Sequence, residues 1–131
     1  MKAALYHVQL NVSKPAFYKD LFTHLKYKVI GEWEDGFGAT DGTVDFWVFR
    51  TAPPYRRRSF HRKATGLNHL AFRVASRGDV NRFARDFLRP RKIRLLYRTP
   101  RAVHEYRKGY YAVYFEDPDR IKLEVVHIPK R

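Results

Sequence analysis

The chain has 131 residues, of which 31% are charged, and 27 Lys and Arg residues against 13 Asp and Glu leave a net charge of +14. A hydrophobic share of 44%, with 10 Phe and 9 Tyr, excludes an intrinsically disordered chain, because such chains lack the apolar surface that offsets ordering entropy. No apolar run approaches the roughly 20 residues of a membrane helix, and the absence of Cys excludes disulfides and thiolate metal sites. We therefore expect one cytoplasmic domain without a membrane partner.

The first half of the chain predicts the element order β-α-β-β-β. Apolar and polar residues alternate over 5–12, which is typical of a strand with one packed face. Ser13 is the expected N-cap of a helix that runs to about Lys26. Strand-like segments follow at 27–33 and 43–50. The Asp-Gly pairs at 35–36 and 41–42 predict turns between the strands.

The same pattern restarts after a basic connector at 53–65. Alternation over 66–74 predicts a strand, and an apolar stripe predicts a helix from about Gly78 to Leu88. Three more strands are expected, at 93–97, 110–116 and 121–127. The strand sequences HVQLNV and HLAFRV occupy the same place in the two halves, which indicates an internal duplication.

The helix of each half should pack on the apolar face of its strands, so polar strand residues point to the opposite, concave face. His7 and His69 have this parity, and Glu124 shares it because Leu123 and Val125 belong to the apolar face. Two imidazoles and one carboxylate with open positions suit a divalent ion such as Fe²⁺, Mn²⁺, Zn²⁺ or Ni²⁺. The alternative is that each is an ordinary polar residue on a strand surface.

Other side chains on the concave face are candidates for contact with a substrate. The predicted binding residues are Gln9, Trp47, Phe49, Arg73 and Tyr110. Tyr114 is the candidate hydrogen-bond donor or acid. His61, just before the second half, is a second catalytic candidate, although a solvated connector residue is an equal interpretation. For the aromatic residues, the alternative is simple filling of the cleft.

The duplication, together with the motifs HVQLNV, AFYKDL, GLNHLAFRV and YYAVYFEDPDRIKLEVV, resembles the vicinal oxygen chelate superfamily. This superfamily includes glyoxalase I, extradiol dioxygenases, and the fosfomycin and bleomycin resistance proteins. The resemblance covers nearly the whole chain. It implies an α+β fold in one domain, in which two βαβββ modules, at about 3–52 and 66–129, enclose a cleft. It also implies a homodimer, and one divalent ion held by His7, His69 and Glu124.

Two positions depart from the pattern of the superfamily. Glyoxalase I-like sites commonly take a fourth ligand from the last strand of the first module, where this chain has Trp47, which cannot bind a metal. The predicted set is therefore His₂Glu, as in extradiol dioxygenases and fosfomycin-modifying transferases. Many relatives also have Gly after Asp-Pro-Asp, where this chain has Arg120. Either the turn differs there, or Arg120 reaches towards the mouth of the cleft.

Three functions follow, in order of preference. The first is a metal-dependent enzyme of the glyoxalase/dioxygenase type that chelates a small, anionic or aromatic substrate through vicinal oxygens. The second is a non-catalytic binding protein of the bleomycin-resistance type. Nucleic-acid binding through the basic run 56–63 ranks third, because the sequence has no recognition-helix pattern. The sequence does not select a reaction or a metal.

Overall fold

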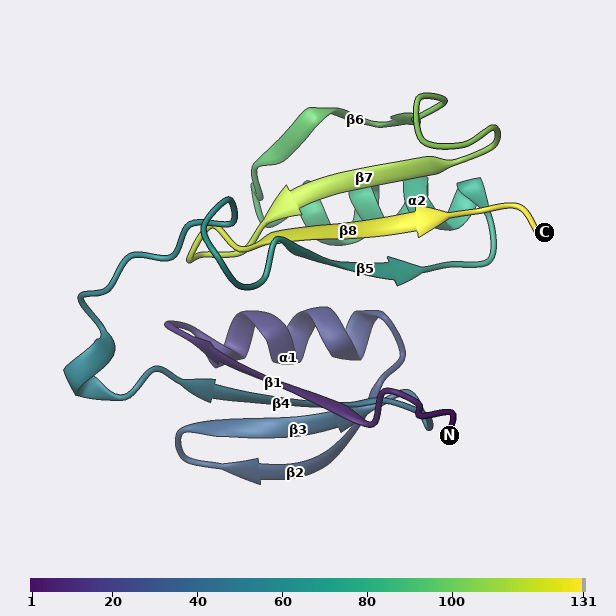
Figure 1. Ribbon diagram of the computed structural model, residues 1–131. Coiled ribbons are helices and arrows are strands. Elements are labelled where there is room, and N and C mark those ends of the chain that lie inside the picture. Colours follow the sequence, from purple (N-terminus) through teal and green to yellow (C-terminus); the bar gives the residue numbers. More distant parts are fainter. Residues whose placement is uncertain (131) are drawn as a thin grey trace. The chain divides into compact units, whose positions relative to one another are not determined.

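The computed structural model describes residues 1–130, and the chain divides into two compact units between Ser59 and Phe60 (Figure 1). Each unit contains a four-stranded mixed sheet with a helix on one face. The predicted α+β duplication of two βαβββ modules is thereby confirmed.

The first unit has the strand order β1-β4-β3-β2. Strand β1 pairs with β4 in parallel, and the other pairs are antiparallel. Its elements are β1 (His7–Val12), α1 (Pro15–His24), β2 (Lys28–Trp33), β3 (Gly36–Thr40) and β4 (Asp45–Arg50).

Helix α1 begins one residue later than the sequence analysis predicts. Pro15 is the first helical residue, so Lys14 and not Ser13 occupies the N-cap position, without a side-chain cap bond. The physical reason is that proline disfavours the helical conformation of the residue before it while its own fixed φ suits a first turn. The helix contacts β2, β3 and β4 and buries the side chains of Tyr18, Leu21 and Phe22.

The turn between β3 and β4 contains the predicted Asp41-Gly42 pair. The carboxylate Oδ1 of Asp41 accepts hydrogen bonds from the backbone N–H groups of Thr43 and Val44, each at 2.8 Å. Gly42 has a φ of +97°, which a residue with a Cβ rarely adopts. The turn sets the register in which Thr40 pairs with Asp45.

The second unit repeats this topology, with the strand order β5-β8-β7-β6. Strand β5 pairs with β8 in parallel, and the other pairs are antiparallel. Its elements are β5 (His69–Arg73), α2 (Arg77–Phe83), a π-helical turn (Ala84–Leu88), β6 (Leu95–Ala102), β7 (Tyr111–Glu116) and β8 (Lys122–His127).

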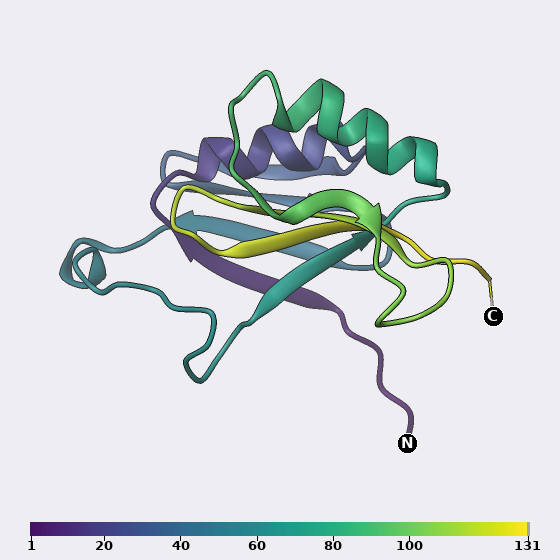
Figure 2. The ribbon, with the colours of Figure 1, turned by 90° about the horizontal axis from the view of Figure 1, so that it is seen from above.

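Helix α2 covers the apolar face of the second sheet. The Ser76 hydroxyl accepts a hydrogen bond from the Asp79 N–H at 3.0 Å and caps the start of the helix. The ring of Phe83 stacks on Phe87 at 5.3 Å between centroids and contacts Phe115 of β7 at 5.4 Å. Among the described residues of the second unit, no helix lies on the other face of this sheet (Figure 2).

Strand β6 differs from its predicted extent of 93–97 and is longer, reaching Ala102. Its register against β7 shifts between Leu96 and Arg101, and Tyr97 and Arg98 inside the shift have φ values of 57° and 55°. Such a bulge is not visible in an alternation pattern, because it breaks the period of two on which the prediction depends.

The connector begins with a short 3₁₀ helix (Pro53–Tyr55) and then runs without regular structure to β5 (Figure 2). None of the helices formed by residues 1–130 combines the length and apolar character that crossing a membrane requires.

Candidate functional site

The face of the second sheet opposite α2 carries the predicted polar residues. The strand register pairs His69 with Lys122, and pairs Glu124 with both Ala71 and Tyr114. Because side chains alternate along a strand, His69 and Glu124 project on the same side, away from the buried Leu123. The alternation in the sequence predicts this arrangement.

Glu124 is the centre of a polar cluster on this face, and it is only 1% exposed. Its Oε1 lies 3.3 Å from Nε2 of His69, and its Oε2 accepts a hydrogen bond from the Tyr110 hydroxyl. The Tyr114 ring stands edge-on to the His69 ring, with 6.4 Å between centroids. The structure therefore brings four predicted site residues together within one unit.

Asn68 sets the orientation of the His69 imidazole. Oδ1 of Asn68 lies 2.7 Å from Nδ1 of His69, while Nδ2 of Asn68 donates to the backbone carbonyl of Arg62 at 3.2 Å. An amide oxygen only accepts, so Nδ1 of His69 carries the hydrogen and the neutral ring has its lone pair on Nε2. That lone pair faces a carboxylate oxygen, an arrangement that a proton or a cation between the two atoms stabilises.

The separation of these two atoms fits two ligands of one metal ion. Metal–ligand bonds of about 2.1 Å at angles of about 90 to 110° place neighbouring donor atoms roughly 3.0 to 3.4 Å apart. The observed distance from Nε2 of His69 to Oε1 of Glu124 is 3.3 Å. The Asn68 contact also supplies the second hydrogen bond that a metal-binding imidazole usually makes.

The two tyrosines beside Glu124 stay protonated and are hydrogen-bond donors. Burial, and then hydrogen bonding to the Glu124 carboxylate, raises the pKa of Tyr110 to about 12. Burial and the negative charge of Glu124 also raise the pKa of Tyr114. Both phenols therefore keep their protons near neutral pH, so they can donate to an oxygen atom but do not act as bases.

A cavity of about 270 Å³ lies beside this cluster. It is lined by the bulged part of β6, the loop after it, β7 and β8, including Tyr97, Arg101, Glu105, Tyr106, Tyr114 and Lys122. Tyr97 and Arg101 were not predicted as site residues, because both belong to a strand whose bulge is not visible in the sequence. The richness of 97–107 in Arg and Tyr is the signal that could have drawn attention to them.

Comparisons with known proteins agree with this fold and length. No family model matches the sequence. The chain is 37% identical to a "putative glyoxalase" from Bacillus halodurans of known crystal structure, with 95% of each chain covered and a TM-score of 0.84. It is 32% identical over 126 residues to the uncharacterized protein YqjT of Bacillus subtilis (strain 168), covering 93% of this chain and 97% of that protein.

A more distant structure shows the same fold. The glyoxylase/bleomycin resistance protein/dioxygenase domain from Frankia sp. EAN1pec is 19% identical, with 99% of this chain and 95% of that chain covered, and has a TM-score of 0.72. The chain belongs to the vicinal oxygen chelate superfamily.

Trp47 occupies the position in the first unit that corresponds to Glu124 in the second. In the second unit, Glu124 pairs with Ala71, two residues after His69. In the first, Trp47 pairs with Gln9, two residues after His7. The register thus agrees with the sequence alignment of the two vicinal oxygen chelate modules, and it puts an indole where a fourth ligand would lie.

Trp47 and Phe49 belong to an aromatic cluster on the polar face of the first sheet. Their rings lie 5.9 and 5.8 Å from the ring of Trp33, a residue that the sequence analysis did not select. A Cβ at Gly31 would lie 2.7 Å from the Trp33 ring, and one at Gly38 would lie 2.3 Å from the Trp47 ring. The two glycines therefore make room for the indoles. Their positions in β2 and β3 are the sequence signal that could have pointed to Trp33.

His7 is the first residue of β1 and is exposed, with its ring edge-on to Tyr6 at 5.0 Å. Within residues 1–130, no three His, Asp or Glu side chains gather as a group that could hold a metal ion. Of the three predicted metal ligands, the structure brings together only His69 and Glu124. His7 as the third ligand stays a prediction.

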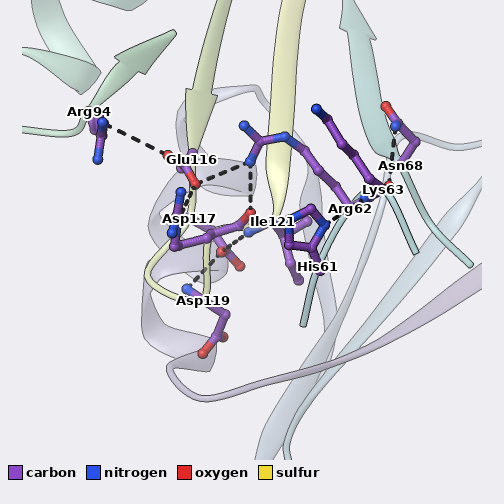
Figure 3. Close-up of polar contacts among 10 residues, drawn as sticks. His61, Arg62, Lys63, Asn68, Arg94, Glu116, Asp117, Asp119 and Ile121 are labelled. Atoms are coloured by element: carbon purple, nitrogen blue, oxygen red, sulfur yellow. Dashed lines mark hydrogen bonds and ion pairs between the residues drawn. The ribbon is translucent and has the colours of Figure 1, made fainter. Parts of the chain in front are cut away.

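Two predicted residues of the second unit have other contacts. Arg73, at the far end of β5 from His69, donates to the backbone carbonyl of Ile128 at 3.0 Å. His61 is exposed, and its Nδ1 accepts a hydrogen bond from the backbone N–H of Lys63 at 3.1 Å (Figure 3). In the described part of the chain, no hydrogen bond joins either residue to Glu124.

Arg120 keeps the turn that glycine forms in many superfamily members. Its φ of 66° is the left-handed conformation that glycine adopts without steric cost. The carboxylate of Asp117 accepts from the backbone N–H groups of Asp119 and Ile121 at 2.8 and 2.7 Å (Figure 3). The Arg120 guanidinium lies 3.1 Å from the buried carboxylate of Glu116. The turn is therefore conventional, and the Arg120 side chain pairs with Glu116.

Proposed function

We propose that this protein is a divalent-metal-dependent enzyme of the glyoxalase/dioxygenase type. The ion would be held by His7, His69 and Glu124 and would take a small substrate through two neighbouring oxygens. The observation that carries the proposal is the 3.3 Å separation of Nε2 of His69 from Oε1 of Glu124, with Nδ1 of His69 bonded to Asn68. Similarity to the Bacillus halodurans protein supports the same activity class.

A divalent ion at this site supplies Lewis acidity, which stabilises an oxyanion that develops on a chelated substrate. The residues of the chain supply the rest. Tyr110 donates to the Glu124 carboxylate and fixes its orientation. Tyr114 keeps its proton and can donate a hydrogen bond to a substrate oxygen. Asn68 keeps the lone pair of His69 on Nε2.

Metal content tests the proposal directly. The wild-type protein, stripped with a chelator and titrated calorimetrically with Mn²⁺ or Zn²⁺, is expected to bind one equivalent. His69→Ala and Glu124→Gln should each weaken binding at least tenfold, and so should His7→Ala. His104→Ala is the matched control, because His104 is exposed and outside the cluster. Unchanged affinity in both His69→Ala and Glu124→Gln would overturn the metal site.

The reaction is tested separately with the metal-loaded protein. The substrate panel contains catechols, thiol adducts of α-ketoaldehydes, and phosphonate epoxides with a thiol. Turnover of one class that disappears in Tyr114→Phe, with metal content unchanged, identifies the reaction type and the role of Tyr114. Stoichiometric binding without turnover of any class points to the second candidate function.

The second candidate is a non-catalytic binding protein, which the aromatic cluster of the first unit favours. Trp33 is 54% exposed beside Trp47 and Phe49, and exposed aromatic faces suit the stacking of a planar ligand. Quenching of tryptophan fluorescence by aromatic glycopeptide ligands, equal in the metal-free and metal-loaded protein, would support it. Quenching that requires the metal would support the enzyme instead.

We also propose that the protein is a homodimer, as in many members of the superfamily. Light scattering coupled to gel filtration is expected to give twice the mass of the 15.7 kDa chain. Mixing His7→Ala with His69→Ala protein then tests whether the ligands of one site come from two chains. If the mixture recovers metal binding, the ligands of one site come from two chains. If the mixture binds metal as weakly as each variant alone, each chain supplies its own set of ligands.

A further inference from the structure

Lys122 is a buried cation on the same sheet face as His69 and Glu124. It is 9% exposed, and no carboxylate among residues 1–130 forms an ion pair with it. Its Nζ instead lies over the rings of Tyr97 and Tyr114, at 4.8 and 5.0 Å from their centroids. Burying an ammonium group is costly unless a negative charge compensates it. Within residues 1–130, Lys122 is thus a buried cation without a direct ion pair, and the nearest acidic positions on its sheet face are Glu116 and Glu124.

The surroundings of Lys122 add further hydrogen-bond donors. The Lys122 ammonium lies over the Tyr97 ring, and the charges of Lys122 and Arg62 lower the pKa of the Tyr97 phenol. Arg101 lines the same cavity and is held by the backbone carbonyls of Tyr97 and Ala102, at 3.2 and 3.0 Å. Arg101 and Lys122 thus place positive charge in the lining of the cavity.

Among residues 1–130, a single acidic residue, Glu105, lines the cavity. Glu105 is exposed, and its carboxylate is paired with Arg101 at 3.1 Å. The remaining polar lining is cationic or phenolic: Tyr97, Arg101, Tyr106, Tyr114 and Lys122. At about 270 Å³ the cavity is slightly smaller than the roughly 300 to 1,000 Å³ of sites for drug-sized ligands, so it suits a small acid or one end of a longer molecule.

The cavity adjoins the proposed metal ligands. Lys122 is the register partner of His69, and Tyr114 contacts both the Lys122 ammonium and the His69 ring. A group bound at Lys122 would therefore lie beside the ligands of the ion. This adjacency gives the cavity a role in the same site.

We propose that the cavity between β6 and β8 binds an oxyanion, a carboxylate or a phosphonate, with Lys122 as its counter-ion and Tyr97 as a hydrogen-bond donor. The identification of this oxyanion as part of the substrate rests on the function proposed above. The binding itself does not, because none of the residues that carry it is a proposed metal ligand. The substrate class that follows is a small organic acid with further oxygens for chelation.

The test uses methylphosphonate and acetate as probes, and acetamide as the neutral counterpart of acetate. Each is titrated into chelator-treated, ¹⁵N-labelled protein at fixed ionic strength, and backbone amide shifts are followed by NMR. We expect saturable shifts at 97–106 and around Lys122 with at least one anion, and none with acetamide. The two anions distinguish a phosphonate site from a carboxylate site. Equal response to acetamide, or shifts spread over exposed Lys and Arg residues, would overturn the proposal.

Variants separate a specific site from the general attraction of a basic protein. Lys122→Met keeps most of the side-chain volume and should weaken anion binding about tenfold or more. Lys28→Met removes one charge from an exposed position in the first unit and should leave the dissociation constant unchanged. Equal weakening in both variants shows only non-specific electrostatics and contradicts the site.

A further variant and a metal titration complete the test. If Lys122→Met does not fold, Tyr97→Phe replaces it, since Tyr97 is half exposed and its ring remains. It should weaken anion binding several-fold, and unchanged binding would then overturn the proposal. Metal binding without anion binding would contradict the anion site but not the proposed metal-dependent function. Anion binding without metal binding would contradict the metal-dependent function but not the anion site.

Discussion

Nδ1 of His69 lies 2.7 Å from Oδ1 of Asn68, and this contact determines which nitrogen His69 presents to Glu124. Asn68 is itself held by the carbonyl of Arg62, which accepts from its Nδ2 at 3.2 Å. A flipped Asn68 amide would place its NH₂ group against His69 and its oxygen against the Arg62 carbonyl. The contacts with Arg62 and His69 therefore favour the same orientation of the amide. Asn68 is thus a positioning residue for the proposed metal ligand, placed there by the connector.

Replacement of Asn68 should therefore weaken metal binding without unfolding the protein. Asn68→Ala removes the acceptor for Nδ1 of His69, and loss of such a partner typically costs about 10- to 100-fold in metal affinity. Asn68→Asp retains an acceptor for Nδ1 of His69 but loses the donor to the Arg62 carbonyl, so its affinity should lie between those of Asn68→Ala and the wild type. Asn81→Ala, at an exposed position on α2, is the control. Equal affinities for Asn68→Ala and the wild type, measured by competition with a chelator, would contradict the positioning role.

Tyr97 should ionise at a lower pH than an ordinary tyrosine. Burial alone would raise its pKa, but hydrogen bonding and the charges of Lys122 and Arg62 outweigh it and lower the pKa below 10.0. Absorbance of the phenolate should show one early-titrating tyrosine that is lost in Tyr97→Phe and moves to higher pH in Lys122→Met. Lys28→Met should leave its titration unchanged.

The same shift has a consequence for stability. Between the folded-state pKa of Tyr97 and 10.0, the unfolded chain binds more protons than the folded one, so the unfolding free energy rises with pH. This contribution is lost as pH falls through the folded-state pKa. Denaturant unfolding of the wild type and Tyr97→Phe across this range measures it, and parallel pH curves for the two proteins would show that Tyr97 is not shifted.

The sequence was sufficient to predict the faces of the sheets. His69 and Glu124 share a side with Tyr114 because alternation with a period of two, read over five or six residues, assigns each side chain to one face. The duplication of the βαβββ order was visible for the same reason. The start of α1 was missed by one residue, because Ser13 and Pro15 are both helix-start signals and proline had the greater effect.

The parts of the site that were missed depend on contacts between residues with no pattern in the sequence. Tyr97 enters the cavity through a bulge that breaks the alternation of β6. Arg62 was counted as part of a basic run, although its side chain is bound by Glu116, 54 residues away. Trp33 was predicted only as part of a strand. Its place beside Trp47 depends on the space that Gly31 and Gly38 leave for the two indoles, which alternation along a single strand does not reveal.

Gly38→Ala should disturb the aromatic cluster of the first unit. A Cβ at this position would lie 2.3 Å from the Trp47 ring, so the indole must move. Overpacking of this kind costs about 1 to 3 kcal/mol of unfolding free energy. The shift of Trp47 should also change the tryptophan emission spectrum. Gly78→Ala is the control, because the nearest neighbour of a Cβ at that position is the flexible tip of Arg82, at 3.2 Å. Equal stability of Gly38→Ala and the wild type would show that the indole is free to move.

The Asp41 carboxylate should stabilise the turn between β3 and β4 in its ionised form. Hydrogen bonds from the backbone N–H groups of Val44 and Thr43 lower its pKa below 3.8. The contribution is therefore present above pH 3.8 and is lost as pH falls through the folded-state pKa. Asp41→Ala should lower the unfolding free energy by about 1 kcal/mol near neutral pH. Asp41→Asn retains the acceptor and should lose less, and a difference between Asp41→Ala and the wild type that does not shrink in acid would contradict the ionic role.

Glu116 should connect the stability of the connector with the metal site. Its carboxylate, 4% exposed, lies 3.3 Å from the Arg62 guanidinium, and Arg62 is 20% exposed (Figure 3). Glu116→Gln weakens this charge-assisted pair and should lower the unfolding free energy by about 1 to 3 kcal/mol. Arg120 also contacts Glu116 but is 72% exposed, so loss of its pairing adds little.

The effect of Glu116→Gln on metal binding tests this connection. The carbonyl of Arg62 holds Asn68, so displacement of Arg62 should free the amide and weaken metal binding in the same direction as Asn68→Ala. The double variant should then be little worse than Asn68→Ala alone, because both changes remove one orienting contact. Glu105→Gln, which breaks the exposed pair with Arg101, is the matched control and should change neither property. Additive losses of metal affinity in the double variant would show that Glu116 and Asn68 act independently.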